Sequence, residues 1–149
     1  MDTYEPLRLL GEGSFGKVYL MRHKIKDKTF CVKVIKVGNL STKEREKCLG
    51  EVSVMRRLNH PNLVRLEEHF LSRRRDSLFI VMQYCDGGDL SEQIKNNLEK
   101  KMLFPERKIM SWFAQATLAL QYMHSNRVLH RDLKTQNIFL LGNGRLVLG

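Results

Sequence analysis

The chain has 149 residues, of which 42% are hydrophobic and 28% are charged, and its formal net charge is +10. This length suits one average domain, and the composition is typical of a soluble globular protein rather than of a disordered chain. No apolar run approaches the ~20 residues needed to span a bilayer, and the first residues lack the basic and apolar regions of a secretory signal.

Cysteine and charge patterns narrow the class of protein further. Cys31, Cys48 and Cys85 are too few and too scattered for a disulfide framework, and none forms a CxxC pair typical of zinc sites. A reducing intracellular compartment therefore fits best, and we expect no membrane partner. The basic cluster SRRRDS at 72–77 lacks the flanking aromatic side chains of a nucleic-acid platform. We expect a solvated hairpin tip there and no nucleic-acid partner.

The first half of the chain is rich in short apolar runs that predict β-strands. The predicted strands cover residues 4–10, 17–23, 29–37, 63–70 and 77–84. Between the third and the fourth strand, a helical period begins after Ser41, which forms a capping box with Glu44, and it ends before Pro61.

The second half is predicted to be mostly helical. Asp89 is the expected N-cap of one helix, with Glu92 three residues later, and Pro105 opens a longer helix that ends near His124. The apolar face expected for this longer helix consists of Ile109, Trp112, Phe113, Ala116, Leu120 and Met123. Two short apolar runs around the turn GNG at 142–144 predict a hairpin. The order of elements predicts an α+β fold in two parts that join near residues 84–88.

A glycine-rich stretch, GEGSFGKV, occupies residues 11–18. In a dinucleotide-binding fold the pattern GxGxxG joins a strand to a helix, whereas here it joins two predicted strands. Glycines at a hairpin tip let the backbone approach phosphate groups without Cβ clashes. By itself the stretch fits a phosphate-binding turn and an ordinary flexible turn equally well.

Lys33 lies in the middle of the third predicted strand, where lysine is uncommon. With a period of two it shares a face with Cys31 and Ile35, so we expect an acidic or phosphate partner for it. Glu51, on the predicted helix, is one candidate for that partner. The alternatives are a lysine that reaches solvent at the sheet edge and an ordinary exposed helical glutamate.

The stretch HRDLKTQN at 130–137 concentrates polar residues just after the long predicted helix. Together with GEGSFGKV, Lys33, Glu51, HPNLV and VMQYCDGGDL, it follows the order of motifs in eukaryotic protein kinases. The sequence resembles that family along essentially its whole length, and LFIVMQYCDGGDL and VLHRDLKTQNIFL are similar to the NIMA-related (Nek) serine/threonine kinases.

This resemblance implies a partial protein kinase domain over residues 1–149, with a kinase-like α+β fold. A five-stranded N-terminal lobe with one helix is expected over residues 1–84, and a hinge over 85–88. The first part of a helical C-terminal lobe is expected over 89–149.

The resemblance also implies a site for ATP and Mg²⁺. The loop over the phosphates is expected to contain Gly11, Glu12, Gly13, Ser14, Phe15 and Gly16. Lys33 is expected to hold the α- and β-phosphates and to pair with Glu51. The groups expected around the adenosine are Val18 and Cys31 above the adenine, Phe139 below it, Met82 as gatekeeper, the backbone of Gln83 and Cys85, and Asp89 at the ribose.

Phosphoryl transfer depends on in-line positioning and on cations near the spreading charge. By resemblance, Asp132 orients the substrate hydroxyl and accepts its proton, and Lys134 stabilises the transferring phosphoryl group. Asn137 is the expected magnesium ligand, Arg131 contacts a phosphorylated activation segment, and His130 is a structural residue rather than a base. A lysine two positions after Asp132 resembles serine/threonine kinases, so the expected enzyme is a non-specific protein serine/threonine kinase.

In the family, an Asp-Phe-Gly motif follows the position of Gly149, and its Asp is the main magnesium ligand. We therefore expect this chain to be a fragment of an active kinase and to transfer little phosphate by itself. Two alternatives stay open: a nucleotide- or partner-binding module without catalysis, and a regulatory decoy that pairs with full-length kinases. The resemblance implies protein substrates with Ser or Thr and a cytoplasmic location, with the cytoskeleton, centrosome or cilium suggested by family analogy. The oligomeric state stays open.

Overall fold

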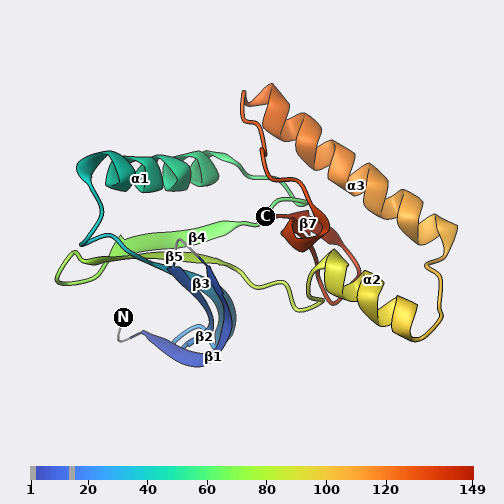
Figure 1. Ribbon diagram of the computed structural model, residues 1–149, viewed down its shortest axis with the longest axis horizontal. Coiled ribbons are helices and arrows are strands. Elements are labelled where there is room, and N and C mark those ends of the chain that lie inside the picture. Colours follow the sequence, from blue (N-terminus) through green and yellow to red (C-terminus); the bar gives the residue numbers. More distant parts are fainter. Residues whose placement is uncertain (1–2, 14–15) are drawn as a thin grey trace. The chain divides into compact units, whose positions relative to one another are not determined.

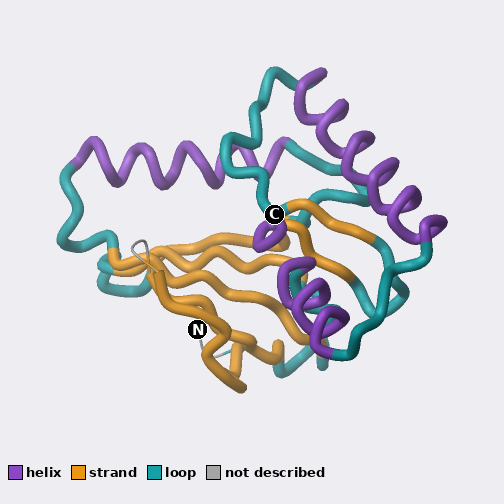
Figure 2. The backbone as a smooth tube through the Cα atoms, turned by 45° about the vertical axis from the view of Figure 1, so that its right-hand side comes forward, coloured by secondary structure: helices purple, strands orange, loops and turns teal. Residues whose placement is uncertain are grey.

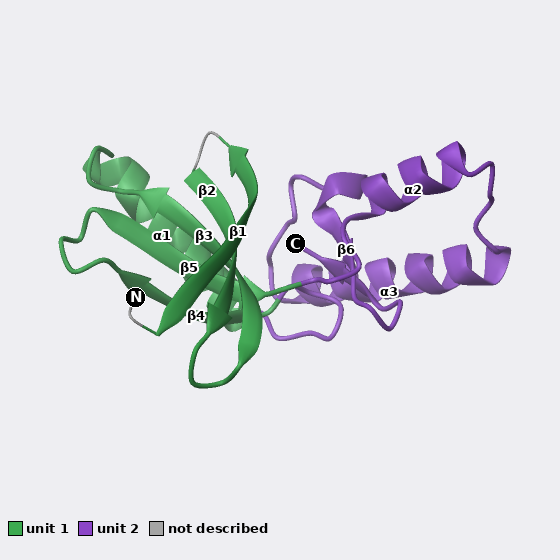
Figure 3. Ribbon diagram, turned by 90° about the horizontal axis from the view of Figure 1, so that it is seen from below, with its two compact units in different colours: residues 1–57, 65–84 green, residues 58–64, 85–149 purple. Residues whose placement is uncertain are grey.

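The computed structural model describes residues 3–13 and 16–149. The chain divides into two compact units, which Figure 3 shows in different colours. The first, called the sheet unit below, consists of residues 1–57 and 65–84, and the second, called the helical unit, of residues 58–64 and 85–149. Residues 58–64, which the sequence assigns to the N-terminal part, thus belong to the helical unit.

The sheet unit contains five antiparallel strands and one helix. The strand order is β1-β2-β3-β5-β4. The strands are β1 (Tyr4–Gly13), β2 (Gly16–His23), β3 (Lys28–Lys36), β4 (Leu66–Leu71) and β5 (Ser77–Gln83). The helix α1 (Thr42–Arg57) lies along one face of the sheet, above β4 in Figure 1.

Alternating residues of the strands build two buried clusters on opposite faces of this sheet. On the face that α1 covers, Val52 of the helix is 1% exposed and packs with Ile35 and Ile80. On the other face, Val32 and Val81 pack with an aromatic group: Tyr4, Phe30, Phe70 and Phe79. The alternation expected along the third strand is therefore confirmed.

Tyr4 links the two edge strands of the sheet. Its hydroxyl donates a hydrogen bond to the carboxylate of Glu68 on β4, and its ring lies 4.9 Å from the ring of His23 and 6.2 Å from that of Phe30. Burial raises the pKa of Tyr4, and the hydrogen bond to Glu68 raises it further. Because β1 and β4 are opposite edges, this contact requires the sheet to curl, as the strands in Figure 2 do.

The helical unit is built around a small hairpin. Its elements are α2 (Leu90–Glu99), α3 (Glu106–Ser125), the 3₁₀ turn η1 (Thr135–Asn137), β6 (Ile138–Leu140) and β7 (Leu146–Leu148). The β6–β7 hairpin lies between α2 and α3 (Figures 1 and 3). Leu146 and Leu148 of the hairpin pack against Trp112 and Met123 of α3, which forms the core of this unit.

The predicted helix starts are confirmed by their hydrogen bonds. The Ser41 amide donates to the Glu44 carboxylate at 2.9 Å, and the Glu44 amide donates to the Ser41 hydroxyl at 3.4 Å, which is a capping box. Asp89 caps α2 by accepting the Glu92 amide at 2.9 Å. Pro105 immediately precedes the first residue of α3.

Two sequence-based predictions about the elements are wrong. The fourth strand begins at Leu66 rather than at residue 63, because Leu63 pairs with Leu148 and the Val64 amide donates to the Leu148 carbonyl. The apolar face of α3 is narrower than predicted. Ile109 is 49% exposed and Phe113 is 67% exposed, because the hairpin covers the neighbouring stripe of the helix instead.

Within the described ranges, every helix is either too short or too polar to pass through a lipid bilayer.

Candidate active site

The described residues of the glycine-rich stretch lie at one end of the β1–β2 pair, where Gly13 pairs with Gly16. Gly16 has a φ of +134°, and a Cβ built on it lies 2.0 Å from the Val34 carbonyl oxygen. Only glycine fits that position without displacing β3. A Cβ on Gly11 or Gly13 meets no atom within 4 Å. Ser14 and Phe15, which the sequence also assigns to this loop, lie outside the described residues.

Just before the tip, the side chain of Glu12 is engaged with a neighbour. Its carboxylate lies 3.3 Å from the ammonium of Lys17, and the strand register places the two residues opposite each other. Both side chains are about half exposed, so this pair contributes little to stability. Glu12 and Lys17 thus form a solvent-exposed ion pair in the β1–β2 hairpin, next to its glycines.

Four of the predicted nucleotide-binding residues share one face of the sheet. Lys33 on β3 is the register partner of Val18 on β2, and Cys31 is the register partner of Met82 on β5. Residues paired in this way point to the same side of an antiparallel sheet, and Cys31 and Lys33 are two positions apart on one strand. The register therefore gathers an apolar wall and one ammonium group on the face that also receives α1.

Cys31 contributes to this wall as an apolar group. Burial raises the pKa of its thiol to about 11, against a smaller opposite effect of the nearby Lys33 ammonium. The thiol is therefore protonated at neutral pH, and it packs as a small hydrophobic side chain rather than acting as a nucleophile.

The expected ion pair between Lys33 and Glu51 is absent from this structure. Among the described residues Lys33 makes no ion pair, and Glu51 is exposed on α1. The reason lies in the rotation of the helix, because the adjacent Val52 fills the core position and turns Glu51 toward solvent. The sequence places both residues, but the structure does not bring them together.

Three further residues predicted to bind the nucleotide, Gln83, Asp89 and Phe139, each contact a neighbour within their own unit. In the sheet unit, the Gln83 amide donates to the Arg65 carbonyl at 2.9 Å. In the helical unit, Asp89 forms an isolated antiparallel bridge with Phe139 of β6. The predicted ribose-binding and adenine-floor residues are therefore direct neighbours. Asp89 also caps α2, so the structural role that the sequence suggested for it is present.

Sequence reasoning missed one residue of this region, Asp86. Its carboxylate accepts the Gly142 amide of the β6–β7 turn at 2.6 Å. The signal available in the sequence was weak: an acidic residue immediately before two glycines, in a stretch where turn residues are expected anyway.

The loop 130–137 holds a compact polar network around Asp132. The Lys134 ammonium lies 2.8 Å from Asp132 Oδ2, and the Asn137 amide nitrogen donates to the same oxygen at 2.8 Å and to the Asp132 carbonyl at 2.7 Å. The Asp132 amide in turn points to Nδ1 of His130 at 3.4 Å. Three residues predicted to be functional are thus brought together, and His130 supports the backbone next to them.

The electrostatics of this network favour an ionised Asp132. The hydrogen bond from Lys134 is the largest cause of a lowered pKa of Asp132, and the hydrogen bond from Asn137 is the next. The carboxylate is therefore charged and solvent-accessible, ready to accept a hydrogen bond from a hydroxyl group. Arg131, immediately before it, has a φ of +65°, a conformation that non-glycine residues adopt rarely and often at functional sites.

The side chains of this loop also fit a hard divalent cation. The Asn137 carboxamide carries an oxygen atom, which is the kind of ligand that Mg²⁺ prefers. The donated hydrogen bonds of Asn137 use its amide nitrogen, so its oxygen is the atom that remains for a cation. No cluster of three His, Cys, Asp or Glu side chains suited to a metal occurs among the described residues. A cation there therefore needs further oxygen ligands, such as phosphate groups.

Comparison with known proteins agrees with this geometry. A family model described as a protein kinase domain matches residues 4–148. The chain is 43% identical to the serine/threonine-protein kinase Nek1 of Mus musculus and 42% identical to Nek3 of the same species, in each case over all of its length. It is 35% identical to human Nek2 over 99% of its length.

The chain spans only 12%, 28% and 34% of the lengths of these three relatives. The matched family model nevertheless covers nearly all of the chain. The five-stranded sheet carries the glycine-rich hairpin and Lys33, and the loop 130–137 carries Asp132, Lys134 and Asn137. The chain belongs to the protein kinase family and resembles its Nek serine/threonine kinases.

Proposed function

We propose that the chain binds ATP with Mg²⁺, and that the protein to which it belongs transfers the γ-phosphoryl group of ATP to serine or threonine hydroxyls of protein substrates. The observation that carries the proposal is the network of Asp132, Lys134 and Asn137, because it holds a charged carboxylate beside an ammonium and an oxygen ligand. In the transfer, the hydroxyl oxygen forms a bond to the γ-phosphorus while the bond to the β-phosphate oxygen breaks. The proton of the hydroxyl passes to Asp132.

The roles of the loop residues follow from their chemistry. Asp132 accepts the hydrogen bond of the hydroxyl and so orients its oxygen, Lys134 places positive charge near the transferring group, and Asn137 supplies an oxygen to Mg²⁺. A bound Mg²⁺ neutralises phosphate charge. Arg131, by family resemblance, contacts a phosphorylated segment of the same protein.

The nucleotide itself is proposed to lie against the face of the sheet that carries Lys33. The described glycines at this end of the hairpin, Gly11, Gly13 and Gly16, are proposed to offer backbone amides to the phosphates, and Lys33 to offer its ammonium. Val18, Cys31 and Met82 supply apolar surface for the adenine, and Phe139 supplies its floor. The backbone of Gln83 and Cys85 is proposed to bind the adenine edge, and Asp89 to accept a ribose hydroxyl.

A second candidate function is nucleotide binding without phosphoryl transfer. One observation favours it: Lys33 and Glu51 do not form the ion pair that an active kinase requires. The two candidates share the nucleotide site and differ only in the role of Asp132.

Two measurements test the proposal. The unfolding temperature of the chain, followed with increasing Mg-ATP, is expected to rise for the parent and to rise much less for Lys33→Met. In the protein that contains this chain, Asp132→Asn is expected to abolish phosphorylation of a generic serine/threonine substrate without abolishing the ATP-dependent rise. A parent chain that ATP does not stabilise would exclude both candidates. A protein that binds ATP but is as inactive as its Asp132→Asn variant would leave only the second.

A further inference from the structure

The segment from Asp86 to Asp89 begins as a turn and is hydrogen-bonded to β6. The Gly87 amide donates to the Leu140 carbonyl at 2.9 Å, and the Leu140 amide donates to the Gly88 carbonyl at 2.9 Å. Asp89 then forms its bridge with Phe139. The spacing between the proposed ribose-binding and adenine-floor residues is therefore set by this pairing.

The pairing depends on unusually close approach of the two backbones. A Cβ built on Gly87 lies 2.7 Å from the Leu140 carbonyl oxygen, too close for any side chain. In addition, the Gln93 side-chain amide of α2 donates to the Gly87 carbonyl at 2.9 Å. The middle of the segment is thus held by both the hairpin and α2.

At its first residue, Asp86, the segment is held to the hairpin by a side chain. The Asp86 carboxylate accepts the Gly142 amide at 2.6 Å, and a Cβ built on Gly142 lies 2.7 Å from Asp86 Oδ2. A charged acceptor makes a stronger hydrogen bond than a neutral one. The hydrogen bond between Asp86 and Gly142 is the contact of this segment with the hairpin that lies next to Cys85 in the sequence. Asp86 is exposed and makes no ion pair among the described residues, so its contact with Gly142 is its main interaction.

We propose that Asp86 is a positioning residue for the adenosine end of the nucleotide. By tying the start of the segment to the β6–β7 turn, it keeps the backbone of Cys85 and the side chain of Asp89 in register with Phe139. Its loss lets the segment separate from the turn, so a smaller fraction of molecules presents these three groups together, and the apparent affinity falls with that fraction. This inference rests on the proposed nucleotide-binding function.

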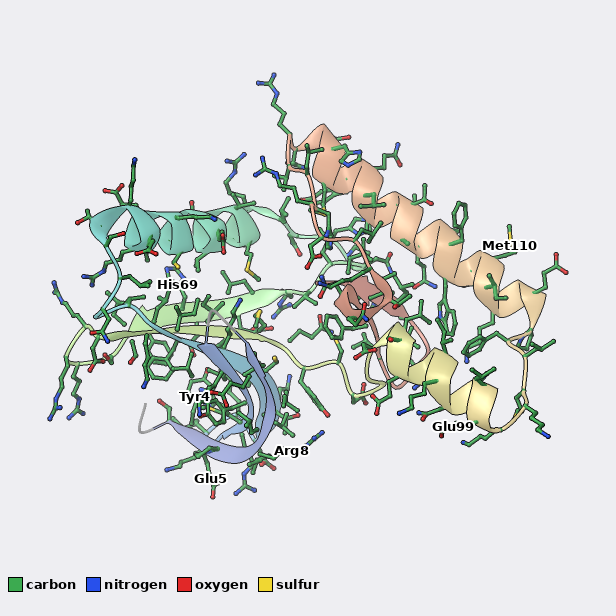
Figure 4. All side chains as sticks on the ribbon, in the orientation of Figure 1. Tyr4, Glu5, Arg8, His69, Glu99 and Met110 are labelled. Carbon is green, nitrogen blue, oxygen red and sulfur yellow. The ribbon has the colours of Figure 1, made fainter. Side chains whose placement is uncertain are left out.

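The test measures binding of adenosine to the purified full chain by isothermal titration calorimetry. Adenosine lacks phosphates, so its affinity reports on the adenine and ribose contacts and not on Lys33 or the glycine hairpin. Asp86→Ala is expected to weaken adenosine binding roughly threefold to tenfold, since the competent fraction falls with the lost hydrogen bond. Asp86→Asn keeps an oxygen acceptor and is expected to restore most of the affinity. Glu99→Ala, which removes an exposed carboxylate at the end of α2, is the matched control (Figure 4).

Amide hydrogen exchange of Gly142 gives a second readout. Exchange is expected to accelerate in Asp86→Ala but not in Asp86→Asn or Glu99→Ala, because only the first variant removes the acceptor. Accelerated exchange with unchanged adenosine affinity would overturn the positioning role while leaving the proposed function intact. Equal weakening in Asp86→Asn and Asp86→Ala would also overturn it, since the hydrogen bond would then not be the cause.

Two further outcomes are decisive. If the parent chain does not bind adenosine, the proposed function fails at its adenosine end and the inference fails with it. If Asp86→Ala lowers the unfolding temperature more than Glu99→Ala does, Gly142→Ala becomes the test variant, because its Cβ displaces the carboxylate from the other side. Adenosine affinity equal to that of the parent in Gly142→Ala would then refute the proposal.

Discussion

At the scale of single residues, Asp132 shows how two neighbours set the charge of a functional group. Lys134 and Asn137 both stabilise the carboxylate form, so the pKa of Asp132 lies below its ordinary value. A group whose pKa is lowered by folding stabilises the fold above its ordinary pKa, and this contribution is lost as the pH falls through the lowered pKa. We predict that Lys134→Met raises the pKa of Asp132 toward the ordinary aspartate value, as measured by ¹³C NMR titration of its carboxyl carbon.

Lys95→Met is the control for this titration, because Lys95 is an exposed lysine of the same unit whose only ion pair among the described residues is with Glu99. It is expected to leave the titration of Asp132 unchanged. An unchanged midpoint in Lys134→Met as well would show that the short contact between Lys134 and Asp132 does not persist in solution.

Gly16 and Gly11 differ sharply although both belong to the same motif. Gly16 combines a positive φ with contact against the Val34 carbonyl, whereas a Cβ on Gly11 meets nothing. Gly16→Ala is therefore expected to destabilise the chain by about 1–3 kcal/mol. Gly11 has no positive φ, so Gly11→Ala is expected to leave the stability unchanged or to raise it by up to about 1 kcal/mol. Urea denaturation followed by circular dichroism compares the two. Equal losses of stability would mean that β3 yields readily at Val34.

The residues of the candidate site were predicted from the resemblance to protein kinases, and that resemblance is carried mostly by short motifs. The loop 130–137 is the clearest case, since Asp132, Lys134 and Asn137 meet within one turn of chain. The pairing of Lys33 with Glu51 could not be predicted in the same way. It depends on how α1 rotates over the sheet, and the fit of Val52 into the core decides that rotation.

At the scale of elements, the same distinction between local and tertiary causes explains what the sequence could predict. Capping by Ser41 and Asp89 involves residues three apart, so both helix starts were predictable. The start of β4 was not predictable, because Leu63 and Val64 carry an ordinary strand pattern and pair instead with Leu148, more than 80 residues later in the chain. Periodicity identifies an apolar residue but not the element that covers it.

Adjacent apolar residues of α3 differ in which element covers them, and this difference can be tested. Trp112 is 6% exposed, donates a hydrogen bond to the Gly144 carbonyl at 3.1 Å and contacts the ring of Phe104, whereas the adjacent Phe113 is 67% exposed. Met110, three residues before Phe113, is likewise exposed, and its side chain is directed outward from the helix in Figure 4. Trp112→Phe is expected to cost about 1–3 kcal/mol because it removes a partly buried hydrogen bond and leaves space in the core.

Phe113→Ser is the matched change on the exposed side of the same helix. It is expected to alter the stability of this chain by about 0.5 kcal/mol or less, because the ring contributes little to the core. The urea midpoints of both variants, measured by circular dichroism, test the assignment. A larger loss in Phe113→Ser than in Trp112→Phe would mean that the helix is rotated relative to the structure described here.

At the scale of the whole molecule, two independent sets of buried residues divide the chain. The clusters around Val81 and Val52 consist only of residues of the sheet unit, and the cluster around Leu146 only of residues of the helical unit. Lys33 belongs to the sheet unit and Asp132 to the helical unit. No single motif contains all of the residues proposed for the function, so the function is recognised in the sequence by the order of its motifs.

The net charge of +10 leads to a prediction that belongs to the molecule as a whole. The chain has 26 Lys and Arg residues and 16 Asp and Glu residues. The electrostatic field of the whole chain therefore attracts a triphosphate and leaves a neutral nucleoside unaffected. We predict that ATP affinity falls roughly threefold to tenfold when the salt concentration rises from about 0.05 M to about 0.5 M, because screening shortens the reach of distant charges. Adenosine affinity is expected to stay nearly constant. Lys33→Met separates the general field from the local contact: it should weaken ATP binding at every salt concentration yet keep most of the salt dependence. If removing this one ammonium abolished the salt dependence, the attraction would come from the site alone and not from the charge of the whole chain.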